Sequence, residues 1–197
     1  MAAIVPRWEW RTFGQGFGAA EERFAALQPE KVQESDEVYL LSPRTDANVK
    51  VREALMDVKD LEQTNPAGLE QWRPVLKGAF PLSPAQVDWL CAEPGVPPVT
   101  AERAGHTLDA LCQELTTPAR GVMAAAVHKR RVRYTIGGCM AEMTAVVADG
   151  KPVRTVAIEG EDADRVVQAV RDMGLATFTN TSYPRGLKAL LGLGASR

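Results

Sequence analysis

Charged residues recur at every second position in several segments of this sequence. Arginine and lysine side chains bind phosphate oxygens, and arginine does so with two parallel hydrogen bonds. Carboxylates that share such a site are suitable ligands for Mg²⁺ or Mn²⁺, which also bridge phosphate oxygens. The pattern predicts a site that grips a polyanion, built from Arg7, Glu9, Arg11, Lys50, Arg52, Asp57, Lys59, Lys129, Arg131, Arg133, Glu142 and Glu159.

The elements that must position these residues are β-strands, because alternation with a period of two places successive side chains on opposite faces. Residues 48–61 alternate twice around a short reversal at 53–55, which indicates a hairpin. In residues 7–13 the charged side chains oppose Trp8 and Trp10, a pair that needs cover on its own face. Further strands are predicted at 37–42, 123–134, 140–147 and 153–159, with turns at Gly137-Gly138 and Asp149-Gly150.

Helices are predicted between and after these strands from apolar spacing and from capping residues. They cover residues 19–27, 66–75, 83–91, 100–115, 162–173 and 186–191. The proline-rich stretch at about 81–120 is predicted to be a helical insertion that caps the β structure or contacts a partner protein. We expect one domain over residues 1–197.

Two arrangements explain the charged faces. A closed antiparallel β-barrel with helices outside, an α+β fold, would turn them into a charged lumen. An open antiparallel sheet with one face in water alternates in the same way, and cross-strand charge pairs are common on such surfaces. Periodicity alone leaves both open.

Other functional classes find little support in the composition. The formal net charge of −2 argues against non-specific binding to nucleic acid or anionic membrane. The three separated cysteines form no zinc motif and suggest a reducing compartment. No apolar run is long enough to span a bilayer, so we expect a cytoplasmic protein. His106 and His128 are expected to be structural, and Gly14, Gly16 and Gly18 a flexible connection rather than a phosphate loop.

In order along the chain, these motifs resemble the CYTH domain proteins, also called triphosphate tunnel metalloenzymes. The resemblance is carried by Glu9-Trp10-Arg11, the basic hairpin at 48–61, Arg131-Val132-Arg133, the Glu142 strand, Ala157-Ile158-Glu159 before a helix, and Ser182-Tyr183. It implies an eight-stranded antiparallel tunnel that hydrolyses tripolyphosphate or another small triphosphate, or cyclises ATP, with Mg²⁺ or Mn²⁺. A homodimer is compatible with it.

Two departures from the family pattern affect the expected metal site. The family opens with Glu-x-Glu-x-Lys, where this chain has Arg7, Glu9 and Arg11, and its later Glu-x-Glu is reduced here to Ala157 and Glu159. Two acids are therefore missing while the basic residues remain. A hydrolase would use Glu9, Glu142 and Glu159 as catalytic residues and metal ligands, whereas the alternative is a module that binds polyphosphate or nucleotide without turnover. In both, the phosphates would lie on Arg7, Arg11, Lys50, Arg52, Lys59, Arg131 and Arg133.

Overall fold

A closed antiparallel barrel forms the body of the protein. The computed structural model describes residues 6–92 and 105–194, and within them eight strands close in the order β1-β5-β4-β3-β2-β6-β7-β8. The strands are β1 (Trp8–Gly14), β2 (Lys31–Leu41), β3 (Asn48–Arg52), β4 (Leu55–Thr64), β5 (Glu70–Ala79), β6 (Met123–Ile136), β7 (Cys139–Ala148) and β8 (Lys151–Gly160). The helices are α1 (Ala19–Ala25), α2 (Pro84–Ala92), α3 (Leu108–Leu115), α4 (Ala163–Asp172) and α5 (Tyr183–Leu191). The predicted α+β barrel is confirmed, and the open sheet is excluded.

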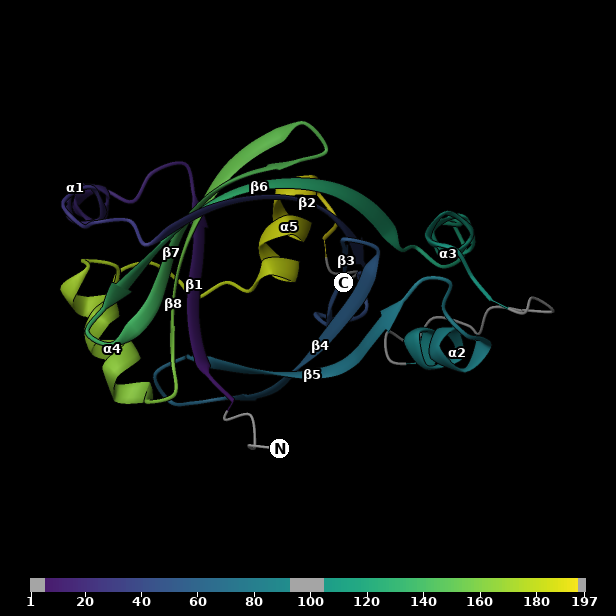
Figure 1. Cartoon of the computed structure of the whole chain (residues 1–197), viewed down its shortest axis with the longest axis horizontal. Coiled ribbons are helices and arrows are strands. Elements are labelled where there is room, and N and C mark those ends of the chain that lie inside the picture. The colour runs from purple at the N-terminus through teal and green to yellow at the C-terminus, as the bar shows by residue number, and fades with distance from the viewer. Residues whose placement is uncertain (1–5, 93–104, 195–197) are drawn as a thin grey trace.

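Helices cover the outer apolar face of the barrel in two places (Figure 1). On one side, Trp10 of β1 packs in a buried cluster with Phe24 of α1 and Val166 of α4. On the other, Val49 and Val51 of β3 pack with residues of α2 and α3. Because these apolar residues face outward under helices, the alternating charged residues of the same strands face the lumen.

One end of the lumen is filled by α5, which Figure 1 shows within the outline of the barrel. Its Tyr183 and Leu187 join a buried apolar cluster with residues of β2, β6, β7 and β8. Gly186 allows the close approach of this helix, because a Cβ atom there would lie 2.5 Å from the ring of Phe13. The lumen therefore has an apolar, filled end and a polar end.

The chain reaches this position through a seam between β1 and β5. These two strands are paired only at Trp8–Gln71 and Glu9–Glu70. Beyond that point Asn180 bridges the gap, because its Oδ1 accepts from the Arg11 amide at 2.7 Å and its Nδ2 donates to the Gly68 carbonyl at 2.6 Å. The final segment thus enters the barrel where strand pairing stops.

One predicted element is wrong. Residues 66–75 form no helix, because residues 66–69 belong to a turn and β5 begins at Glu70. Pro74, Gly78 and two register shifts against β4 interrupt the alternation that would have identified this strand. The predicted helix at 66–75 is thus replaced by the strand that completes the eight.

Other predicted elements differ at their ends. The strand expected at 37–42 starts six residues earlier, at Lys31, and the last helix starts at Tyr183. The described part of the helix expected at 100–115 is α3, and residues 93–104 of the expected insertion lie outside the described residues. None of the helices in the described ranges has both the length and the apolar composition needed to cross a bilayer.

Candidate functional site

The polar end of the lumen contains a cavity of about 180 Å³. The predicted site residues that line it are Glu9, Glu142, Glu159, Arg11, Lys50, Arg52, Lys59, Arg131 and Arg133. Strand alternation explains this convergence, since each residue stands at an inward position of its strand. Lys129 and Tyr183 also line the cavity, as do Tyr39 and Trp72, which the sequence analysis did not single out.

Arg7 is the predicted phosphate-binding residue that does not line this cavity. It is exposed at the rim, with Nη1 3.6 Å from Oε1 of Glu159, and it donates to the sulfur of Met140 at 3.0 Å. It belongs to a wider outer cavity at the mouth of the barrel.

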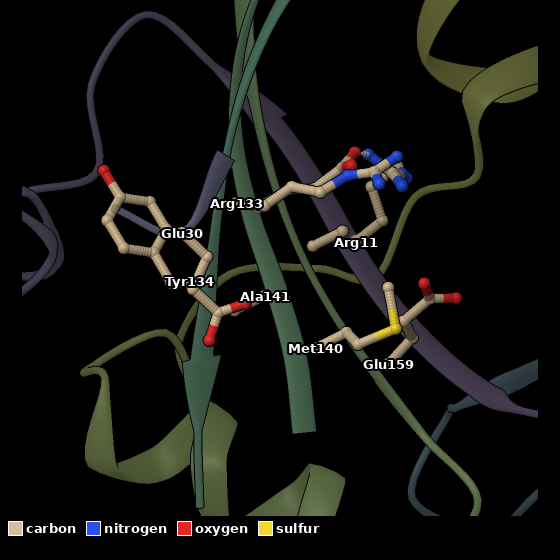
Figure 2. A pocket seen from close by; sticks show the side chains of 9 residues that line it. Arg11, Glu30, Arg133, Tyr134, Met140, Ala141 and Glu159 are labelled. Atoms are coloured by element: carbon tan, nitrogen blue, oxygen red, sulfur yellow. Dashed lines mark hydrogen bonds and ion pairs between the residues drawn. The ribbon is translucent and has the colours of Figure 1, made fainter. Parts of the chain in front are cut away.

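Three cations of the inner cavity have no carboxylate partner within the part of the chain that the structure describes. They are Arg52, Lys59 and Arg133, each half-buried and from a different strand. Figure 2 shows the guanidinium group of Arg133 directed toward that of Arg11, whereas the ring of Tyr134 points away. Cations that repel one another in a partly buried space, without internal partners, favour the entry of an anion.

Arg11 lies at the centre of a second set of contacts. In the sheet register it stands beside Ala157 of β8, which in turn stands beside Glu142 of β7. The small side chain of Ala157 leaves room for Arg11, whose Nη1 donates to Glu142 Oε1 at 2.9 Å while its Nε donates to Glu9 Oε1 at 2.8 Å. Its guanidinium also lies 4.4 Å from the ring centre of Tyr183. One guanidinium thus bridges two of the three predicted metal-binding carboxylates.

The charge states of these carboxylates follow from their neighbours. Burial tends to raise the pKa of Glu142, but Arg11 outweighs it and lowers this pKa below its ordinary value. Burial, together with the negative charge of Glu9, raises the pKa of Glu159. The two acids therefore differ, with Glu142 committed to an ion pair and Glu159 the easier one to protonate.

A third set of contacts lies deeper, around Glu37 of β2. Its two carboxylate oxygens accept from Lys129 Nζ at 2.9 Å and from Arg131 Nη2 at 2.6 Å. Lys129 Nζ also donates to the Tyr39 hydroxyl at 2.5 Å and lies 3.7 Å from the ring centre of Tyr183. Glu37 is a residue of this candidate site that the sequence analysis missed, because its contacts depend on partners in β6.

The metal site implied by the family resemblance does not fit this arrangement. Glu9, Glu142 and Glu159 border one cavity, but Arg11 occupies the position between the first two and Arg7 lies beside the third. In the described ranges, no three acidic, histidine or cysteine side chains converge on a common position for one ion. Hard divalent cations require several oxygen ligands, and here Arg11 already engages one carboxylate oxygen each of Glu9 and Glu142.

Comparison with known proteins places the fold. No protein-family model and no curated protein matches the sequence. Among solved structures, a conserved hypothetical protein from Pyrococcus furiosus is similar with a TM-score of 0.52 and 16% identity, covering 90% of this chain and 98% of that chain. The protein HpAC1 from Hippeastrum, described as an adenylyl cyclase candidate with a dominant triphosphatase activity, is similar with a TM-score of 0.50 and 9% identity, covering 93% and 95%. The resemblance to the CYTH domain proteins is therefore confirmed at the level of the fold.

Proposed function

We propose that the inner cavity binds the phosphate chain of a small triphosphate, inorganic or organic. The observation that carries this proposal is the set of three lumen cations without carboxylate partners among the described residues, Arg52, Lys59 and Arg133. Phosphate oxygens would supply the missing negative charge in a site where water competes weakly. Arg11, Lys50 and Arg131 support the same potential while holding carboxylates.

Binding is tested with tripolyphosphate by calorimetry and by thermal unfolding, in buffer with a chelator and in buffer with Mg²⁺. We expect a raised melting temperature in both, because a ligand of the folded state stabilises it by mass action. Arg133→Ala should weaken binding by about tenfold or more, the loss of a charge-assisted hydrogen bond.

The matched control for this substitution is Arg130→Ala. Arg130 lies on the same strand but is exposed on the outer face and pairs loosely with Glu34. Its replacement should leave the affinity unchanged. Equal weakening by both substitutions would mean that the effect is general electrostatics, and the proposal would fail.

Hydrolysis of the bound triphosphate with Mg²⁺ or Mn²⁺ is a second candidate, favoured by the triphosphatase activity given for HpAC1. The acids nearest to such a reaction are Glu9, Glu142 and Glu159, and Arg11 would have to release the first two before they could hold a metal ion. Release of phosphate from tripolyphosphate and from ATP should then depend on added metal and be lost in Glu9→Ala. If the wild type binds the ligand but releases no more phosphate than Glu9→Ala, the hydrolysis hypothesis fails and only the binding function remains.

A further inference from the structure

Trp72 of β5 differs from the other tryptophans of the chain. Trp8, Trp10 and Trp89 pack against the apolar clusters beneath the helices. Trp72 belongs to none of these clusters, is half-buried, and makes no ring contact or side-chain hydrogen bond within the described residues. A large indole that borders a charged cavity and lies outside the apolar clusters is costly to keep unless a partner beyond the described residues covers it.

The position of Trp72 is the junction of two cavities. The inner cavity of about 180 Å³ and the outer cavity of about 740 Å³ at the mouth share Glu9, Lys59, Trp72 and Glu159 in their walls. The unpaired cations Arg52 and Arg133 line only the inner one, whereas Pro6, Pro74 and Arg73 line only the outer one. A molecule with its phosphates on the inner cations would place its other end beside Trp72.

We infer that the ligand is an organic triphosphate that carries a flat ring, and that Trp72 is the surface on which this ring stacks. The inference rests on the proposed binding function and narrows its ligand class. Tripolyphosphate alone would fill the inner cavity but leave the outer cavity, and the part of the Trp72 side chain that borders it, uncovered. Stacking on an aromatic side chain tolerates different rings because every ring offers a π face, so Trp72 selects for a ring rather than for one particular base.

The test compares ATP, UTP and tripolyphosphate by calorimetry, with a chelator present, on the full chain and on two variants. The wild type should bind ATP more tightly than tripolyphosphate. Trp72→Ala should weaken ATP binding by about 5- to 150-fold, the range supplied by one base–aromatic stack, and weaken tripolyphosphate binding much less. Trp72→Phe should restore most of the ATP affinity, because it retains an aromatic face.

Tryptophan fluorescence gives an independent readout. ATP should quench the emission of the wild type and quench Trp72→Phe much less, since the remaining tryptophans pack in apolar clusters. The inference is overturned if ATP binds no more tightly than tripolyphosphate, or if Trp72→Ala weakens both ligands equally. Failure of the broader function is a different result, in which none of the three compounds binds the wild type.

Discussion

Glu37 is the residue on which the electrostatic balance of the deep lumen depends. Its side chain is fully buried and forms ion pairs with both Lys129 and Arg131. Burial by itself raises the pKa of Glu37, but Lys129 and Lys50 outweigh it and hold this pKa well below the ordinary value of 4.5. Glu37 in turn raises the pKa of Arg131 and opposes the burial that lowers the pKa of Lys129 well below its ordinary value.

Glu37→Gln should lower the free energy of unfolding by about 3–5 kcal/mol at pH 7, because it leaves buried cations without their counter-charge. Glu34→Gln is the matched control on the same strand, since Glu34 is exposed and its ion pair with Arg130 is long. It should change stability by less than about 0.5 kcal/mol. Urea unfolding of the three proteins measures both effects.

The depressed pKa of Glu37 also predicts a pH dependence. The unfolded chain binds a proton near pH 4.5 and the folded chain only at lower pH, so the stabilising contribution of Glu37 is fully present above about pH 4.5. It is lost as the pH falls toward the folded pKa. Between about pH 6 and pH 3 the wild type should therefore lose more stability than Glu37→Gln. Equal losses in the two proteins would contradict this assignment.

The alternation in the sequence predicted which face of each strand the site residues lie on, but not how deep in the lumen they lie. Lys50, Arg52 and Arg133 were placed on the correct face because each opposes apolar neighbours that need cover. Glu37 gave no comparable signal, since its face continues into Tyr39 and Leu41 and mixes charge with apolar residues. That mixture has a physical cause, because the inward face of β2 runs from the polar cavity to the end filled by α5.

The contact of Arg11 with Glu142 across Ala157 spans three strands, and only the sheet register defines it.

At the scale of elements, the β1–β5 seam is the weakest join of the barrel. Two residue pairs connect these strands, whereas β1 and β8 are paired along seven positions from Trp8 to Gly14. β5 was also the strand that the sequence analysis mistook for a helix, because Pro74 and the register shifts break its alternation. Irregular pairing and an irregular sequence pattern thus occur in the same element.

Asn180→Ala should loosen this seam, because it removes the acceptor of the Arg11 amide and the donor to the Gly68 carbonyl. We expect a loss of about 1–3 kcal/mol in the free energy of unfolding, the usual cost of leaving partly buried polar groups unpaired. Hydrogen exchange should show faster exchange of the Arg11 amide than in the wild type. Thr179→Ala serves as the control, because this neighbouring side chain is exposed. The Thr181 amide also donates to the Arg11 carbonyl at 2.6 Å. Unchanged exchange at Arg11 in Asn180→Ala would show that this bond and the strand pairing hold the seam without Asn180.

Considered as a whole, the molecule separates charge by location. The formal net charge of the chain is −2, yet cations outnumber carboxylates among the charged residues that line the inner cavity. A barrel with its apolar face turned outward under helices makes this separation possible, since charged side chains face inward without disturbing the packed layers. The attraction for anions is therefore concentrated inside the barrel, and a total taken from composition does not reveal it.

Within the described residues, the helix that fills one end of the lumen leaves the inner cavity open toward the mouth of the barrel. A bound phosphate chain would enter with its terminal phosphate leading and leave through the same opening. One ligand would therefore have to dissociate before the next could bind. Only the end of a long polyphosphate, and not an internal stretch, could then enter the inner cavity. A cyclic polyphosphate has no chain end and would not enter it. With Tyr183 and Leu187 across the far end, α5 would therefore make the proposed site select the ends of phosphate chains.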